Sequence, residues 1–172
     1  MTNDNETQSK MKVLFVCLGN ICRSPAAQGV MQALIDSRGI SDMFYLDSAG
    51  TYGGHAGDLP DSRMRQHARR RGYDLTHRSR QIKGSDFEDF DVIVAMDEGN
   101  RRNLSRMAAT IDEERKIVMM GLYITKYPHY DYVPDPYYEG AEGFELVLDL
   151  LEDSCAVLLD SLIEQMRKQN NY

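Results

Sequence analysis

A cysteine and an arginine stand six positions apart near the start of the chain, in the segment Cys17-Leu18-Gly19-Asn20-Ile21-Cys22-Arg23-Ser24-Pro25. A thiolate is a strong nucleophile, and a guanidinium offers two parallel N–H donors to the oxygens of a phosphoryl group. A loop closed between Cys17 and Arg23 would place both groups around one tetrahedral oxyanion. We therefore predict phosphoryl transfer to sulfur, with Cys17 as the nucleophile and Arg23 as the phosphate clamp.

The residue types between these two positions suit an anion-binding loop. Gly19 can turn without the steric penalty of a Cβ, and Asn20 tolerates the left-handed backbone conformation. Pro25 marks the first turn of a helix, whose N-terminus would direct N–H groups and positive potential toward the anion. The same field would favour the thiolate of Cys17, and Ser24 can donate a hydroxyl hydrogen to it. The loop contains no lysine and no G-x4-G-K-[ST] pattern, so we do not expect a nucleotide-binding loop.

The elements that must position this loop follow from apolar patterning. The nearly continuous apolar run 11–16 predicts a strand buried on both faces of a parallel sheet. Apolar residues then recur at helical spacing from Pro25 until Gly39. Further strands are predicted at 44–49, 91–96 and 116–119, and further helices at 61–71, 97–108 and 143–168. This alternation predicts a single doubly wound α/β domain, a four-stranded parallel sheet with helices on both faces and a site at the strands' carboxyl ends.

Composition limits the classes of function. Residues 1–10 are polar and are interpreted as a flexible leader before a domain spanning 11–172. The chain has 20 Lys and Arg against 27 Asp and Glu, a net charge of −7, which argues against nucleic-acid binding. No apolar run approaches the roughly 20 residues needed to cross a bilayer, so we expect no membrane association, a cytoplasmic location and a monomer.

The basic side chains of the predicted helix 61–71 are interpreted as a solvated face. The alternative is a docking patch for an acidic substrate, formed by Arg63, Arg65, Arg69, Arg70 and Arg71. The long connection between residues 119 and 143 holds six tyrosines and is a candidate active-site lid, because irregular segments of this length are uncommon unless functional.

The three cysteines and four histidines have no metal-ligand spacing, so neither zinc nor any other cofactor is expected. Cys155 lies in an apolar helical pattern and is predicted to be core. Two interpretations of Cys22 stay open: a small buried hydrophobe, or a partner of Cys17 in a reversible disulfide that protects the nucleophile.

The segment 17–25 resembles the signature of the low-molecular-weight protein tyrosine phosphatase family, and the resemblance extends over nearly the whole chain. Later landmarks follow in the expected order: Asp47-Ser48-Ala49-Gly50-Thr51, His77 through Gln81-Ile82, Phe90-Asp91, Met96-Asp97-Glu98 and Asp135-Pro136-Tyr137-Tyr138. The resemblance implies hydrolysis of phosphotyrosine in protein substrates through a phosphocysteine intermediate, without a metal or cofactor.

The resemblance also assigns roles to residues. Asp135 would be the general acid, which suits a departing tyrosyl oxygen that needs a proton. Tyr137 and Tyr138 would form an aromatic wall of the substrate site. His77 would hydrogen-bond to Asn20 or Ser48 and hold the shape of the loop. The remaining substrate-binding residues would be those of the loop, Leu18, Gly19, Asn20, Ile21, Cys22 and Ser24.

One position departs from the family pattern. An aromatic residue commonly stands three positions after the Thr of Ser-Ala-Gly-Thr, whereas this chain has Gly54. The cleft would then be wider or more mobile on that side, or Tyr52 or His55 would compensate. The sequence leaves these possibilities open.

Three other functions remain as alternatives. A thiol-linked arsenate reductase on the same fold needs additional downstream cysteines, and none lies between Cys22 and Cys155. A phosphoarginine phosphatase typically carries threonine where this chain has Ile21, and an apolar side chain there favours an aryl ester. A non-catalytic phosphate-binding module would have no use for a nucleophile, a clamp and an acid together.

Overall fold

The computed structural model describes residues 9–170, in which four parallel strands form one sheet in the order β2-β1-β3-β4. The strands are β1 (Met11–Cys17), β2 (Phe44–Gly50), β3 (Val92–Ala95) and β4 (Ile117–Met119). The predicted four-stranded parallel sheet is therefore confirmed. Most of the predicted leader, residues 1–8, lies outside the described residues, and Ser9 and Lys10 are exposed without regular structure.

Within residues 9–170, six α-helices connect or follow the strands. They are α1 (Arg23–Ser37), α2 (Ser62–Arg70), α3 (Asp86–Asp89), α4 (Glu98–Met107), α5 (Ile111–Glu114) and α6 (Ala141–Asn170). Two short 3-10 helices, η1 (Ser41–Met43) and η2 (Met120–Tyr123), precede β2 and follow β4.

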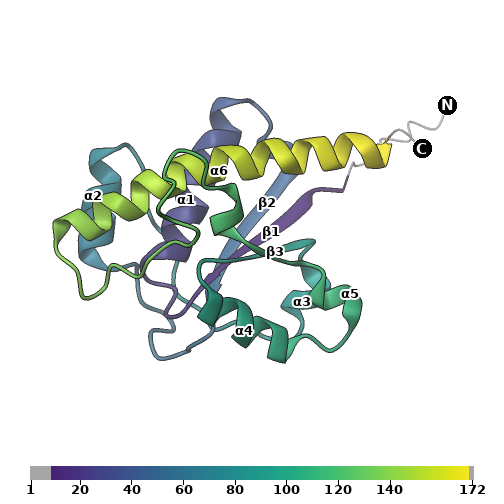
Figure 1. Ribbon diagram of the computed structural model, residues 1–172, viewed down its shortest axis with the longest axis horizontal. Helices are drawn as coiled ribbons and strands as arrows, with labels where there is room; N and C mark the ends of the chain where they lie inside the picture. The colour runs from purple at the N-terminus through teal and green to yellow at the C-terminus, as the bar shows by residue number, and fades with distance from the viewer. Residues whose placement is uncertain (1–8, 171–172) are drawn as a thin grey trace.

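The helices cover both faces of the sheet, as predicted for a doubly wound domain (Figure 1). Side chains alternate along β1, so that Val13 and Phe15 pack toward α1 and α6, while Leu14 and Val16 pack toward α3 and α4. All four side chains are fully buried. This double burial explains why the strand reads as a continuous apolar run.

Local sequence signals set several helix boundaries. The side chain of Asp61 caps α2 by accepting from the N–H of Arg63, and Gly72 follows this helix at a φ of +88°. Asp97 and Asn100 form a capping box at the start of α4. Helix α1 begins at Arg23, two residues before the predicted start at Pro25, so the end of the loop is already helical.

The strand order places a topological switch point at the carboxyl end of β1. The chain passes from β1 to β2 on one side of the sheet and later to β3 on the other. Ligands of open α/β sheets bind in the crevice at such a point, and the loop 18–22 begins there.

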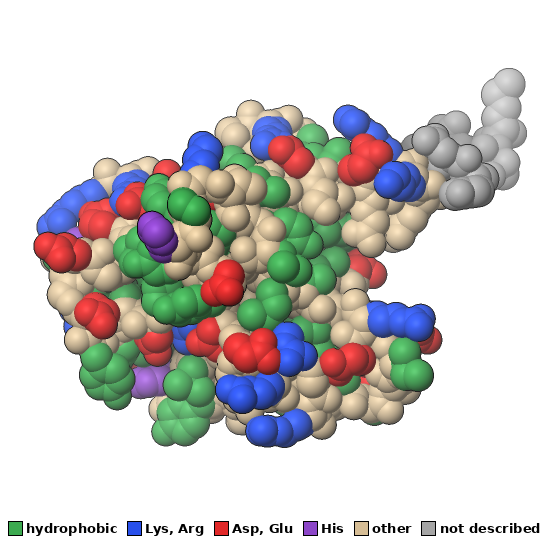
Figure 2. Space-filling view, in the orientation of Figure 1, with side chains coloured by type: hydrophobic (Ala, Val, Ile, Leu, Met, Phe, Trp, Pro, Cys, Tyr) green, Lys and Arg blue, Asp and Glu red, His purple; other side chains and the backbone are tan. Residues whose placement is uncertain are grey.

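One face of the molecule carries charged side chains of both signs (Figure 2). On the face shown in Figure 2, acidic and basic side chains are interspersed. Within residues 9–170, no helix is long and apolar enough to span a membrane.

Candidate active site

The loop after β1 presents free main-chain donors. None of the hydrogen bonds formed among residues 9–170 is donated by a main-chain N–H of residues 18–24. The N-cap of α1, Cys22, makes no side-chain cap, and the first turn of this helix contains no acidic residue. Asn20 adopts a φ of 56°, which curls the loop. Unpaired N–H groups at a helix N-terminus form an anion-binding site.

A cavity of about 220 Å³ opens beside this loop. Cys17 is only 3% exposed, yet it lines the cavity together with Arg23 and Asp135. The Cys17 Sγ lies 3.0 Å from the Ser24 Oγ, as expected for a hydroxyl that supports a thiolate. The other lining residues are Leu18, Gly19, Ile21, Cys22, Tyr52, His55, Tyr137 and Tyr138. The structure thus brings the predicted nucleophile, clamp and acid together.

Acidic partners and a carbonyl fix the orientation of Arg23, which is 2% exposed. Its Nη1 donates to the Asp97 Oδ2 at 2.6 Å and to the Val133 carbonyl at 3.1 Å. Its Nη2 lies 3.7 Å from the Asp135 Oδ2. Burial opposes the charge of the guanidinium, but the neighbouring Cys17 and Asp97 outweigh it and raise the pKa of Arg23. The guanidinium of Arg23, the predicted clamp, is therefore charged and held at the cavity wall.

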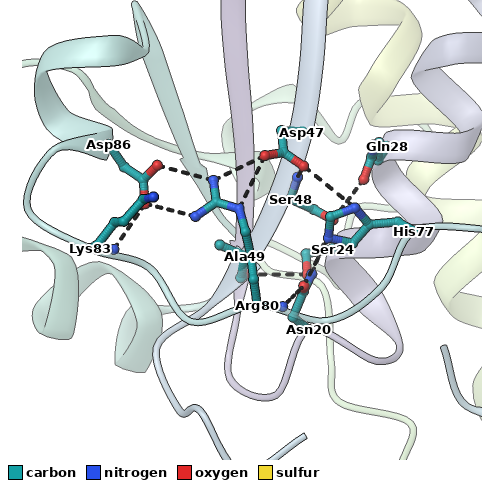
Figure 3. Close-up of polar contacts among 10 residues, drawn as sticks. All are labelled: Asn20, Ser24, Gln28, Asp47, Ser48, Ala49, His77, Arg80, Lys83 and Asp86. Atoms are coloured by element: carbon teal, nitrogen blue, oxygen red, sulfur yellow. Dashed lines mark hydrogen bonds and ion pairs between the residues drawn. The ribbon is translucent and has the colours of Figure 1, made fainter. Parts of the chain in front are cut away.

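A hydrogen-bond network behind the loop fixes its shape (Figure 3). The buried Asn20 donates from Nδ2 to the Ser24 Oγ at 2.7 Å and to the Ser48 Oγ at 3.0 Å. Its Oδ1 accepts from the main-chain N–H of Arg80 at 3.0 Å and lies 3.1 Å from the His77 Nε2. These four contacts hold the left-handed residue in place. The side chain of His77 contacts Asn20, and the main chain of Ser48, the other predicted partner, is a further hydrogen-bond partner.

Arg80 extends this network across the sheet edge. Its guanidinium forms ion pairs with Asp47 and the buried Asp86, each at 3.0 Å (Figure 3). The His77 Nδ1 lies 3.4 Å from the Asp47 Oδ1. Burial lowers the pKa of His77 and Arg80 lowers it further, against the opposing effect of Asp47. Sequence reasoning missed Arg80 and Asp86, because no local pattern indicates that they meet Asp47.

The aromatic residue missing at Gly54 is replaced by a neighbour. Tyr52 and His55 both line the cavity, as does the pair Tyr137 and Tyr138 from a later segment of the chain. A Cβ added to Gly54 would overlap with the ring and hydroxyl of Tyr52. The Tyr52 ring therefore occupies the space that a side chain at Gly54 would need. Tyr137 and Tyr138 pack edge to face with ring centroids 4.9 Å apart.

Several predicted residues lie behind the loop and do not line the cavity. The side chains of Asn20, Ser24 and Ser48 are fully buried, and His77 lies beside them, so Asn20 and Ser24 can face an anion only through their main chain. Of the tyrosines in the predicted lid, Tyr137 and Tyr138 line the cavity. The others pack elsewhere, as in the pair Tyr130 and Tyr132.

The cysteines differ in environment. Cys22 lines the cavity but is 4% exposed, and burial raises the pKa of its thiol, with Asp61 and Cys17 adding to the effect. Cys22 is therefore a protonated neighbour of the predicted nucleophile. Within the described residues no disulfide joins Cys17 to Cys22, and Cys155 is fully buried in the core as predicted.

A larger cavity of about 620 Å³ lies at the opposite end of the sheet, near Met11, Val92 and Gln169. It contains none of the predicted site residues. The described part of the chain holds no cluster of three His, Cys, Asp or Glu side chains that could bind a metal ion.

The fold and the site define a doubly wound α/β protein whose first strand ends in a cysteine above an anion-binding loop. The profile of the family "Low molecular weight phosphotyrosine protein phosphatase" matches residues 12–170. A Synechocystis relative named for this class of phosphatase is 48% identical over 156 residues, which cover 91% of this chain and 99% of the relative. The chain belongs to the low molecular weight phosphotyrosine protein phosphatase family.

Solved structures agree with this assignment. A protein tyrosine phosphatase from Entamoeba histolytica superposes with a TM-score of 0.88 at 44% identity, covering 91% of this chain and 99% of that one. A Drosophila arginine phosphatase superposes with a TM-score of 0.82 at 37% identity, covering 88% of this chain and 98% of that one.

Proposed function

We propose that this chain is a protein tyrosine phosphatase that hydrolyses phosphotyrosine in protein substrates through a phosphocysteine intermediate. The observation that carries the proposal is the meeting of Cys17, Arg23 and Asp135 in one cavity beside a loop of unpaired main-chain N–H groups. Membership of the family supports it.

The first step transfers the phosphoryl group to sulfur. The N–H groups of the loop and the Arg23 guanidinium bind the phosphate oxygens. The Cys17 thiolate attacks phosphorus, and the bond between phosphorus and the tyrosyl oxygen breaks. Asp135, in its protonated form, gives its proton to that oxygen as it leaves.

The second step hydrolyses the phosphocysteine. Asp135, now ionised, takes a proton from water, and the water oxygen bonds to phosphorus while the bond to sulfur breaks. Inorganic phosphate leaves, and the Cys17 thiolate re-forms beside the hydroxyl of Ser24, 3.0 Å away.

The lining of the cavity favours an aryl phosphate. Tyr52, Tyr137 and Tyr138 offer aromatic surface to a substrate ring, and Ile21 adds an apolar side chain. The likeness to an arginine phosphatase makes phosphoarginine the alternative to test. We further propose a cytoplasmic location and a monomer.

The test compares phosphotyrosine, phosphoserine and phosphoarginine peptides as substrates, with arsenate reduction measured alongside. We expect turnover of phosphotyrosine alone. Cys17→Ser should abolish turnover while the phosphotyrosine peptide still binds, which calorimetry would detect, because the loop and Arg23 remain. Efficient hydrolysis of phosphoarginine with phosphotyrosine untouched, or full activity of Cys17→Ser, would overturn the proposal.

A further inference from the structure

Arg63 links two segments beside the cavity: the phosphate-binding loop, through Asp61, and the segment 134–139 that carries Asp135. It lies in the first turn of α2, where the Asp61 Oδ1 accepts from its main-chain N–H at 2.9 Å and from its Nε at 3.1 Å. The Asp61 Oδ2 accepts from the Arg63 Nη2 at 2.9 Å. The main-chain N–H of Asp61 donates to the carbonyl of Ile21 at 2.8 Å. The Arg63 guanidinium is thus oriented from the side of the phosphate-binding loop.

The other side of this guanidinium contacts the segment that carries Asp135. Its carbon lies 5.5 Å from the ring centroid of Tyr137 and 4.8 Å from that of Phe144. Its Nη2 also donates to the Tyr137 carbonyl at 3.0 Å. Phe144 is 1% exposed and belongs to the main core, so the contact rests on a rigid part of α6.

The contact continues to the carboxylate. The main-chain N–H of Tyr137 donates to the Asp135 Oδ1 at 3.0 Å, and the Asp135 Oδ2 faces Arg23. Among the hydrogen bonds of the described chain, the bond from Arg63 is the only one that joins residues 134–139 to another part of the protein. The ion pair of 3.7 Å between Asp135 and Arg23 is the other polar link.

We propose that Arg63 is a positioning residue for the general acid: it holds the main chain of Tyr137 so that the Asp135 carboxylate points at the leaving-group oxygen. This inference rests on the proposed function. Misplacing an acid by a fraction of an ångström weakens proton transfer most where the leaving group needs a proton most.

The test measures kcat/KM for aryl phosphates whose phenols range from phenol to p-nitrophenol. Arg63→Met keeps the aliphatic stem and removes the guanidinium. We expect it to lower kcat/KM about tenfold for phenyl phosphate and less than about twofold for p-nitrophenyl phosphate, because the acid matters least for a good leaving group. Arg63→Lys should restore part of the loss. Arg69→Met, on the same helix but 71% exposed, is the matched control and should behave as wild type.

A double-mutant cycle separates positioning from a general structural role. In an Asp135→Ala background, Arg63→Met should cause no further loss, because the group it positions is gone. The comparison of two substrates on one sample is independent of the folded fraction. An equal loss for all leaving groups, or a full additional loss in the Asp135→Ala background, would overturn the inference. If wild type hydrolysed no aryl phosphate, the proposed function would fail instead.

Discussion

At the rim of the cavity, Gly54 and Tyr52 act as one structural unit. The Tyr52 ring is 57% exposed and lies where a side chain at Gly54 would be. A glycine at this position therefore does not leave the cleft open, because the ring two residues earlier fills the space. His55 completes this side of the cavity and would be in contact with any side chain added to Gly19.

Replacing Gly54 by alanine tests whether this ring contacts the substrate. The new Cβ would overlap with Tyr52 and rotate its ring toward solvent. Losing one aromatic contact of about 0.5–1.5 kcal/mol should raise KM for a phosphotyrosine peptide roughly two- to tenfold. Steady-state kinetics would measure this change, and the melting temperature should stay near that of wild type because Tyr52 is exposed.

Tyr52→Ala serves as the comparison for this substitution. It removes the ring directly and should raise KM to a similar extent. If Tyr52→Ala raised KM and Gly54→Ala did not, the ring would keep its place despite the added methyl group, contrary to the expectation.

The site residues that could be predicted from the sequence are those that belong to a recognisable sequence pattern. Cys17, Arg23 and the loop between them are a contiguous signal, and Asp135 came from a resemblance that spans the chain. Arg63 and Arg80 were missed because their partners lie far away in sequence, Tyr137 in one case and Asp47 in the other. The interpretation of the α2 arginines as a solvated face fits Arg69 and Arg63, which are both exposed, but it did not indicate that Arg63 also donates to the Tyr137 carbonyl.

At the scale of elements, strands and helices with strong patterns were predictable. The buried runs of β1 and β3 and the caps at Asp61 and Asp97 place their elements to within a few residues. Helices α3 and α5 were not predicted, since four residues are too few to show a periodicity. The segment between η2 and α6 has no regular structure, so only its contacts determine its path.

Asp153 anchors the start of this irregular segment by hydrogen bonds. This residue of α6 is 6% exposed, and its carboxylate accepts from the main-chain N–H groups of Thr125 and Lys126 at 2.7 and 2.9 Å. It also accepts from the Thr125 hydroxyl at 2.8 Å. Burial alone would raise the pKa of Asp153, but these hydrogen bonds outweigh it and lower the pKa.

Asp153→Ala should destabilise the protein by about 2–3 kcal/mol, because it leaves two N–H groups without their charged acceptor. Urea unfolding would measure the loss, and hydrogen exchange at Thr125 and Lys126 should accelerate. Asp160→Ala, on the same helix in a surface ion pair with Arg38, is the control and should change stability by less than about 0.5 kcal/mol. If the two substitutions lowered the free energy of unfolding equally, the hydrogen bonds of Asp153 to Thr125 and Lys126 would contribute no more to stability than a surface ion pair.

At the scale of the whole molecule, α2 packs against α6, far along the sequence (Figure 1). Arg71, just after α2, forms ion pairs with three acidic residues of α6. They are Glu145, Asp149 and Glu152, the last two at 2.9 Å. His67 adds a contact of 2.8 Å to Glu145 and stacks on the ring of Phe144. The single guanidinium of Arg71 thus pairs with three carboxylates of α6.

The pH dependence of stability should report this network. The contact with His67 lowers the pKa of Glu145 below its ordinary value of 4.5, burial opposes this effect, and Arg71 adds to it. A carboxyl whose pKa is lower in the folded than in the unfolded protein stabilises the fold above the unfolded pKa. That contribution is lost as the pH falls through the folded pKa. The network should therefore stabilise the protein at pH 7 and fail in acid.

Arg71→Met tests this expectation, since it keeps the apolar stem and removes the charge that three carboxylates share. At pH 7 it should lower the free energy of unfolding by about 1 kcal/mol, a modest value because these groups are partly exposed to solvent. The difference from wild type should shrink as the pH falls through the lowered pKa of Glu145, and urea unfolding at pH 7 and at successively lower pH values would show it. Arg69→Met should follow wild type throughout. A constant difference at all pH values would mean that Arg71 acts through packing, and that the junction between α2 and α6 does not depend on charge.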